Sequence, residues 1–196
     1  MKQPAKQTAR VIIFSGPSGA GKTTLHDMIL KSAEFRGKIV RSISATTRKP
    51  RGRERHGREY LFLTQRMFEY KIRSGQFIEW ARVFDHYYGT PMKNVREILR
   101  RGKSVLLCID VQGGRQVKKK IPDAIAIFIK TPTLKELRRR LEKRATDDKA
   151  SIELRLGTAE KELAQVRHYD HVVVNDRLDR AFEEVSQILR HAIGRG

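Results

Sequence analysis

A glycine-rich octapeptide near the start of the chain combines the residue types that hold a chain of phosphates. It reads Gly16-Pro17-Ser18-Gly19-Ala20-Gly21-Lys22-Thr23 and matches the pattern G-x-x-x-x-G-K-[ST]. The glycines let backbone N–H groups turn inward around the phosphates, Lys22 reaches the terminal phosphates, and the Thr23 hydroxyl is suited to bind Mg²⁺. The pattern therefore predicts a nucleoside triphosphate site.

A second feature is an apolar run that ends in a carboxylate. Residues 105–110 end in Asp110, which is expected at the carboxyl edge of a parallel sheet, beside the phosphate loop. In that place Asp110 would orient a water molecule on Mg²⁺. An alternative interpretation is that the carboxylate caps the helix that follows.

The elements that must position these groups alternate between strand and helix. An apolar run over residues 10–15 predicts a buried strand directly before the phosphate loop, and Leu25, Met28 and Ile29 have helical spacing after it. The pattern continues with strands predicted over 38–44, 104–110, 124–130 and 172–175, and helices over 24–35, 93–101, 115–119, 133–144, 151–168 (with Ser151 as N-cap) and 178–193. This alternation indicates an α/β fold with a parallel sheet core.

One segment interrupts the alternation. Strand-like runs at 59–63, 77–83 and 86–90, with a helix-like run at 66–74, predict an inserted lobe of mixed α+β structure. The short polar stretch at 145–150 is typical of a hinge or lid tip. We therefore divide a single domain, residues 1–196, into a core (10–44, 92–143 and 156–196), the inserted lobe (45–91) and a short helical lid (144–155).

Composition bounds the class of protein. The 196 residues include 42 Lys and Arg against 22 Asp and Glu, a formal net charge of +20, and are 39% hydrophobic, enough for one globular core. No apolar run approaches the roughly 20 residues that span a bilayer, and the single cysteine, Cys108, excludes an internal disulfide. We expect a cytoplasmic protein with no membrane partner. The charge favours anionic ligands, either small polyanions in a cleft or nucleic acid.

The basic stretch that opens the inserted lobe carries a longer signature. The pattern T-x-R-x-x-R-x-x-E-x-x-G-x-x-Y-x-F is matched by Thr46, Arg48, Arg51, Glu54, Gly57, Tyr60 and Phe62. It is the pattern of guanylate kinases, and further similar segments extend the match from residue 10 to about residue 190. The chain thus resembles the guanylate kinase family of P-loop nucleoside monophosphate kinases. The resemblance implies transfer of the γ-phosphoryl of ATP to GMP, and to dGMP, giving ADP and GDP in purine nucleotide metabolism.

The resemblance also assigns residues to each substrate. It implies an ATP site made by Gly16, Pro17, Ser18, Gly19, Ala20, Gly21, Lys22, Thr23, Thr24 and, after the last strand, Asn175. It implies a GMP site made by Ser44, Arg48, Arg51, Tyr60, Glu79, Tyr88 and Thr90. The cofactor Mg²⁺ would be bound by Thr23 and, through water, by Asp110.

The chemistry of the implied acceptor residues is consistent with those roles. Two guanidinium groups and a phenol hydroxyl are directed donors for a dianionic phosphate. Guanine presents N1–H and N2–H₂ donors that adenine lacks, so a carboxylate facing that edge, Glu79, would select guanine.

One position departs from the family pattern. An acidic residue commonly stands two positions before Asp110 and helps to hold the guanine amino group, whereas this chain has Cys108 there. A thiol is a weak acceptor. We therefore hypothesise that guanine selection depends more heavily on Glu79 than in the rest of the family.

The reaction itself requires alignment and charge neutralisation more than proton transfer, because the second pKa of the acceptor phosphate is about 6. We expect Lys22 and Arg48 to be catalytic cations, and the family resemblance implies three more, in and behind the lid, at Arg140, Arg144 and Arg155. Because these groups come from separate segments, the lobe and the lid are predicted to close over the substrates.

Three other functions fit parts of the sequence. Guanylate-kinase-like scaffold domains bind phosphorylated peptides without catalysis, but they commonly lack an intact phosphate loop. A P-loop kinase acting on a ribose phosphate would have no use for Glu79, Tyr88 and Thr90. Nucleic-acid binding is motivated only by the charge, and we expect no specific nucleic-acid partner. Whether the protein is a monomer or a homo-oligomer is left open.

Overall fold

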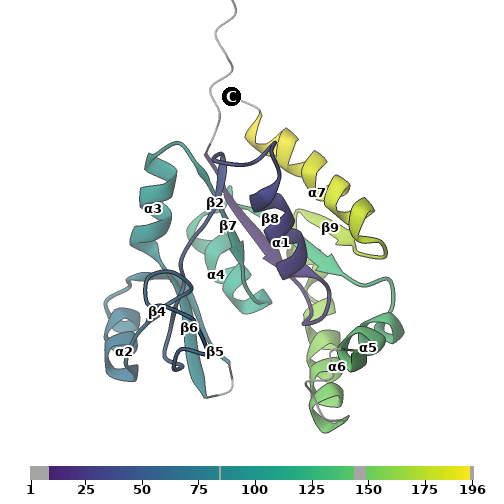
Figure 1. Ribbon diagram of the computed structural model, residues 1–196, viewed down its shortest axis with the longest axis horizontal. Coiled ribbons are helices and arrows are strands. Elements are labelled where there is room, and N and C mark those ends of the chain that lie inside the picture. Colours follow the sequence, from purple (N-terminus) through teal and green to yellow (C-terminus); the bar gives the residue numbers. More distant parts are fainter. Residues whose placement is uncertain (1–8, 84, 144–148, 195–196) are drawn as a thin grey trace, which may run out of the picture.

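The computed structural model describes residues 9–83, 85–143 and 149–194. Two sheets make up the fold (Figure 1), a parallel sheet of five strands and a smaller mixed sheet of four. This arrangement confirms the predicted α/β class and parallel core. None of the helices in the described ranges is long and apolar enough to cross a bilayer.

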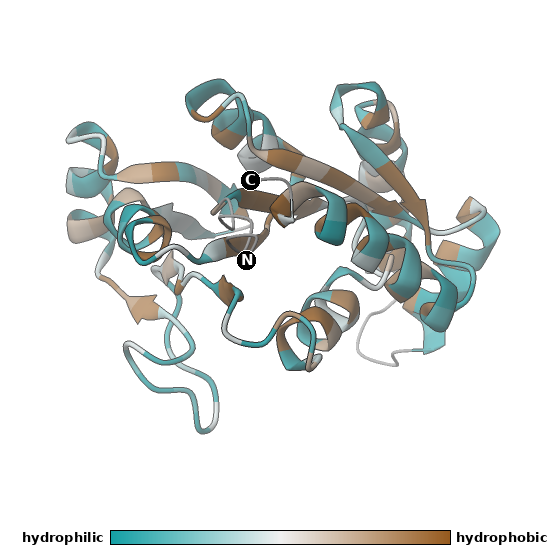
Figure 2. Cartoon of the chain, turned by 90° about the horizontal axis from the view of Figure 1, so that it is seen from above, coloured by the Kyte–Doolittle hydropathy of each residue, from teal (hydrophilic) through white to brown (hydrophobic). Residues whose placement is uncertain are grey.

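The parallel sheet has the strand order β2-β7-β1-β8-β9. Its strands are β2 (Ile39–Arg41), β7 (Ser104–Cys108), β1 (Val11–Ser15), β8 (Ile125–Lys130) and β9 (His171–Val174). The central strands are apolar throughout because helices cover both faces. Figure 2 shows this core as brown strands between helices with hydrophilic outer faces.

Four helices cover the parallel sheet. On one face lie α1 (Lys22–Lys31) and α7 (Leu178–Ile193), which share a buried apolar cluster with Phe14 and Leu106. On the other lie α3 (Met92–Arg100) and α4 (Val111–Lys120), which pack against Ile13 and Leu107. Successive residues of one strand point to opposite faces, so β1 and β7 each contribute to both clusters.

The smaller sheet builds the inserted lobe. Its order is β4-β3-β6-β5, with β3 (Ala45–Thr46), β4 (Leu61–Phe62), β5 (Phe77–Val83) and β6 (His86–Pro91). Helix α2 (Gln65–Arg73) packs on it through Phe68, whose ring stacks on Phe77 at 4.4 Å between centroids. The Thr64 hydroxyl caps α2 by accepting from the Met67 N–H. The lobe therefore has its own small core.

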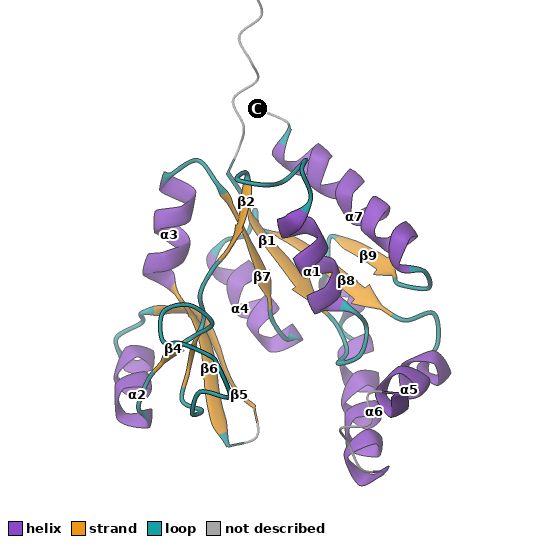
Figure 3. Ribbon diagram, viewed as in Figure 1, coloured by secondary structure: helices purple, strands orange, loops and turns teal. Residues whose placement is uncertain are grey.

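A helical pair forms the second arm of the molecule. Helices α5 (Leu134–Lys143) and α6 (Lys149–Leu163) meet along an apolar seam that includes Leu137, Leu141 and Leu156. The pair is followed by a short 3₁₀ helix, η1 (Val166–His168). Figure 3 shows the lobe and this pair projecting from the same end of the parallel sheet, on either side of its strand ends.

Several predicted boundaries are wrong. The strand predicted over 38–44 covers only Ile39–Arg41, because the chain leaves the parallel sheet after Arg41 and joins the lobe sheet as a separate strand from Ala45. The strand predicted over 104–110 ends at Cys108, because Asp110 caps α4, which begins at Val111 and not at residue 115. The helix predicted over 151–168 begins at Lys149, so Ser151 lies inside it, and it ends at Leu163.

Candidate active site

The phosphate loop joins β1 to α1, and its glycines adopt conformations that other residues rarely reach. Gly16 has φ +133°, and a Cβ there would lie 2.0 Å from the Ile129 carbonyl oxygen. Gly21 caps α1 at φ +94°, and a Cβ there would lie 2.2 Å from the Asn175 Nδ2. Only glycine fits both positions without displacing its neighbours. The loop thus presents its backbone and the start of α1 to an anion.

Lys22 and Asn175 hold the loop in shape. The Lys22 ammonium donates to the carbonyl oxygens of Gly16, at 2.5 Å, and Pro17, at 2.9 Å. Asn175 directly follows β9, and its buried side-chain amide donates to the Ala20 carbonyl oxygen at 2.8 Å. Asn175 is thereby brought to the loop from the far end of the sequence.

A cavity of about 420 Å³ opens on the α7 side of the loop. Its walls include Gly19, Gly21, Thr24, Arg140, Asn175 and Leu178. The volume is in the range of small-ligand pockets. Half of the eight lining residues belong to the predicted ATP set, and the structure brings the loop, Thr24, Asn175 and Arg140 together.

A second cavity, of about 340 Å³, lies on the other side of α1. We call it the acceptor cavity. It is bounded by α1 at Thr23, by the end of β7, by Ser44, and by lobe residues that include Tyr60 and Thr90. Thr23 is therefore next to both the phosphate loop and the acceptor cavity.

The basic segment of the lobe is fixed by one carboxylate, Glu54. The Arg48 guanidinium makes a two-bonded pair with Glu54, at 2.6 and 2.7 Å, and the Arg51 backbone N–H donates to the same carboxylate at 2.8 Å. These contacts lower the pKa of Glu54 to about 2. Glu54 matches one position of the family pattern, but the sequence alone predicted no role for it. Its spacing of three and six residues from two arginines was the available signal.

Aromatic rings complete the setting of Arg48, which is only 7% exposed. Its guanidinium lies 5.0 Å from the Tyr60 ring centroid and 5.7 Å from that of Phe62. The Tyr60 ring in turn meets Tyr88 edge to face at 6.2 Å. Arg48, Tyr60 and Tyr88 therefore converge at one place, with Arg51 held beside them through Glu54.

Glu79 is a buried carboxylate paired across the lobe sheet with Thr90. Glu79 is 5% exposed, and the Thr90 hydroxyl donates to its Oε1 at 2.5 Å. Burial raises the pKa of Glu79 to about 7, with the hydrogen bond from Thr90 opposing the rise and Asp110 adding to it. A Cβ on Gly113 would lie 2.8 Å from Glu79 Oε2, so the first turn of α4 approaches the carboxylate closely.

Asp110 caps helix α4. Its Oδ1 accepts from the Gly113 N–H at 2.8 Å, as the capping interpretation expects. The last residue of β7 is Cys108, which lines the acceptor cavity together with Thr23 and Asp27. The sheet edge beside Thr23 thus carries the Cys108 thiol, and the Asp110 carboxylate lies two residues later in the chain.

The lid contributes two described arginines. Arg140 donates to Glu136 and to the Asn175 carbonyl oxygen, each at 2.8 Å. Arg155 of α6 donates to the Ser18 hydroxyl of the phosphate loop at 3.3 Å. Arg144 lies outside the described residues.

Glu162, also on α6, was not anticipated from the sequence. It lies two turns after Arg155 and so on the same helix face. Burial raises the pKa of Glu162 to about 7, with Lys22 lowering it and Asp110 raising it. Helix α6 therefore turns a cation and a carboxylate toward the phosphate loop.

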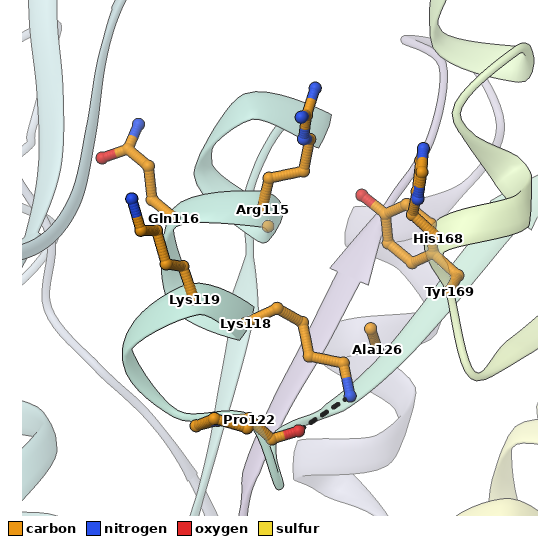
Figure 4. Close-up of a pocket in the computed structure, with 9 residues that line it drawn as sticks. Arg115, Gln116, Lys118, Lys119, Pro122, Ala126, His168 and Tyr169 are labelled. Carbon is orange, nitrogen blue, oxygen red and sulfur yellow. Dashed lines mark hydrogen bonds between the residues drawn. The ribbon is translucent and has the colours of Figure 1, made fainter.

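A larger cavity, of about 590 Å³, is elsewhere (Figure 4). It lies between α4 and η1, and its walls include Arg115, Lys118, Lys119, His168 and Tyr169. None of the predicted substrate residues lines it. Volume alone would have misplaced the active site.

Comparisons with known proteins identify the family. The family model described as guanylate kinase matches residues 8–192. The chain is 46% identical over 187 residues to a guanylate kinase of Rubrobacter xylanophilus, covering 95% of this chain and 96% of that protein. It is 44% identical to one of Myxococcus xanthus, covering 91% and 85%. A crystal structure of guanylate kinase from Anaplasma phagocytophilum superposes with a TM-score of 0.75 at 30% identity, covering 98% of this chain and 92% of that one. The chain belongs to the guanylate kinase family.

Proposed function

We propose that the two cavities beside Lys22 and Thr23 hold the two nucleotides of a guanylate kinase reaction. The protein transfers the γ-phosphoryl of ATP to GMP, with ADP and GDP as products. The observation that carries the residue assignments is that Thr23 adjoins both the phosphate loop and the acceptor cavity. A donor held in the loop and an acceptor held in that cavity would meet at this point.

The donor site is the phosphate loop with the cavity beside Asn175. In this proposal the backbone N–H groups of the loop and the start of α1 bind the phosphates. Lys22 exchanges its contacts with Gly16 and Pro17 for phosphate oxygens when ATP enters. The nucleoside lies against Thr24, Arg140 and Leu178 in the adjoining cavity.

The residues around Thr23 fit Mg²⁺. They are oxygen donors, which Mg²⁺ prefers, and Mg²⁺ usually takes one or two protein groups in addition to phosphates and waters. Such a site is compatible with finding no cluster of three metal-binding side chains in the described ranges. We assign Thr23 as the direct ligand and Asp110, through its Oδ2 and a water, as an outer one. Bound Mg²⁺ would neutralise charge on the transferred phosphoryl.

The acceptor phosphate binds where Arg48, Arg51, Tyr60 and Tyr88 converge. Arg48 is already desolvated and oriented by Glu54 and the aromatic rings, so little ordering is needed when GMP binds. Guanine then extends to Glu79 and Thr90, with Ser44 on the same wall of the cavity. The Glu79 carboxylate accepts from N1–H and N2–H₂, and adenine offers no equivalent pair.

Transfer proceeds without a general base. An ionised oxygen of the GMP phosphate attacks the γ-phosphorus, the bond from that phosphorus to the β,γ-bridging oxygen breaks, and the electron pair leaves with ADP. Lys22, Arg48, Arg140, Arg144 and Arg155 balance the negative charge that accumulates between the nucleotides. Closure of the lobe and the lid would exclude water from this space. X-ray scattering with GMP and a nonhydrolysable ATP analogue tests closure; an unchanged radius of gyration would contradict it.

A coupled kinase assay tests the assignment. Purified protein with ATP and Mg²⁺ is given GMP, dGMP, AMP, CMP or UMP, and ADP release is followed. We expect turnover with GMP and dGMP and little with the others. Lys22→Ala is the inactive control. ATP consumption without formation of GDP would contradict the proposal. The cytoplasmic location and the absence of a specific nucleic-acid partner stay predictions from composition.

A further inference from the structure

The sheet edge beside Thr23 lacks a carboxylate on its own strand. Cys108 ends β7 and pairs in register with Phe14 of β1, just before the phosphate loop. In P-loop enzymes a strand carboxylate near the loop holds a water of the Mg²⁺ shell. A thiol is mostly uncharged at neutral pH and is a weak acceptor. The end of β7 therefore offers only a weak hydrogen-bond acceptor to the water shell of a metal ion.

Helix α1 places a different carboxylate on the same wall. Thr23 and Asp27 are four residues apart in α1, so their side chains lie one above the other on one helix face. Both line the acceptor cavity together with Cys108. The Asp27 side chain is 52% exposed, which leaves it accessible from the cavity.

The neighbouring histidine fixes the direction of Asp27. His26 is 6% exposed, and its Nδ1 lies 2.9 Å from Asp27 Oδ1. Burial lowers the pKa of His26, although Asp27 opposes this change, so the ring is neutral at pH 7 and donates from Nδ1. The hydrogen bond occupies Oδ1 and leaves Oδ2 of Asp27 for another donor.

The other carboxylates of the cavity wall are engaged by cations or by backbone N–H groups. In the described part of the chain, Glu54 pairs with Arg48, and Glu59 accepts from the Arg55 N–H and lies 3.1 Å from Arg58. Asp27 differs because, within residues 9–83, 85–143 and 149–194, its side chain has one hydrogen-bond partner, the neutral His26 ring. It therefore keeps its negative charge available to the cavity.

We propose that Asp27 is a positioning residue for the metal of the donor nucleotide. Its carboxylate accepts hydrogen bonds from a water of the Mg²⁺ shell beside Thr23, at the sheet edge where β7 ends in Cys108. Mg²⁺ keeps several waters when it binds to proteins, so an outer carboxylate has donors to accept from. This inference rests on the proposed function, because it needs ATP and Mg²⁺ at the phosphate loop.

Mn²⁺ binding tests the inference without relying on turnover. Free Mn²⁺ is measured by electron paramagnetic resonance with the protein, a nonhydrolysable ATP analogue and GMP. Asp27→Asn should raise the Mn²⁺ dissociation constant about tenfold, the size expected for loss of an outer-shell partner. The double variant Asp27→Asn, Cys108→Asp should recover most of that loss, because it returns a carboxylate to the same wall. Asp123→Asn, at an exposed carboxylate paired with Arg10, is the matched control.

The outcomes separate three claims. Wild-type Mn²⁺ affinity in Asp27→Asn would overturn the inference. So would a loss that Cys108→Asp does not restore, since that would indicate a general disturbance of α1. Weaker GMP binding measured without metal, with Mn²⁺ affinity unchanged, would assign Asp27 to the acceptor nucleotide and also overturn it. If the wild type itself binds no Mn²⁺ with the nucleotides, the metal site of the proposed function fails instead.

Discussion

The acceptor lobe and the helical lid both supply arginines, but they hold them differently. In the lobe, Arg48 is buried, paired with Glu54 six residues away and stacked on aromatic rings. In the lid, Arg155 reaches Ser18 through an exposed hydrogen bond between residues 137 positions apart. In the proposed site, local contacts would therefore orient Arg48 before GMP binds, whereas the lid arginines would reach the phosphates through contacts between distant segments.

This difference has a kinetic meaning. A group that contacts the acceptor phosphate equally in the ground state and in the transition state contributes to affinity, and its loss raises KM. A cation that reaches the phosphoryl group only on closure acts mainly on the transition state, and its loss lowers kcat. The lobe should therefore control substrate affinity and the lid should control turnover.

The largest effect is expected in the lid. Arg155→Met should lower kcat by about 10²- to 10³-fold, the size seen when one transition-state donor is removed. The dissociation constants of GMP and the ATP analogue should stay within about twofold, well under the tenfold that corresponds to 1.4 kcal/mol. Steady-state kinetics and calorimetry measure the two quantities. Arg138→Met is the matched control, because Arg138 pairs with the exposed Glu153. A change confined to KM would remove the contrast between lobe and lid.

A smaller effect is expected when the preorganisation of the lobe is removed. Glu54→Gln takes away the charge that orients Arg48 and leaves its size, so the KM for GMP should rise about tenfold while kcat falls less. Glu59→Gln, a nearby carboxylate with a backbone partner, should leave KM nearly unchanged. Equal effects of the two variants would show that Glu54 has no special role.

The pH dependence of GMP binding tests the guanine end of the lobe. Burial holds the pKa of Glu79 at about 7, so the carboxylate is ionised at pH 8 and mostly protonated at pH 6. Only the ionised form accepts both guanine donors, so GMP affinity should fall by up to about tenfold between pH 8 and pH 6. Binding of GMP should in turn lower this pKa and release a proton. Glu79→Gln should lose that dependence and keep only the part due to the GMP phosphate, whose pKa is about 6.

The smallest effect is expected at Cys108. If guanine selection depends mainly on Glu79, Cys108→Asp should raise the ratio of GMP to AMP turnover by a few-fold, near the lower end of what one added hydrogen bond contributes. Parallel kinase assays with the two nucleotides measure that ratio. An unchanged ratio would refute the hypothesis that Cys108 affects guanine selection.

Sequence reasoning succeeded where the chemistry is local in the chain. The phosphate loop is continuous from Gly16 to Thr23, and the glycines that its backbone conformation requires are visible directly in the sequence. The parallel sheet followed from apolar runs that alternate with amphipathic segments, and the order of the strands agrees with that fold. The ends of helices and strands were predicted less accurately, because a cap such as Asp110 depends on where the chain turns as well as on residue type.

The sequence by itself determined the family, the phosphate loop and the residues available for each nucleotide. Only the tertiary structure decided which of them contact one another or line the same cavity. It placed Asn175 against Ala20, Arg155 against Ser18, and Asp27 in the same cavity as Cys108. The physical reason is that residue type and spacing fix local hydrogen bonds and helix faces, whereas contacts between distant segments depend on how the buried apolar faces pack. That packing brings the ends of β1, β7 and β9 to one edge of the sheet.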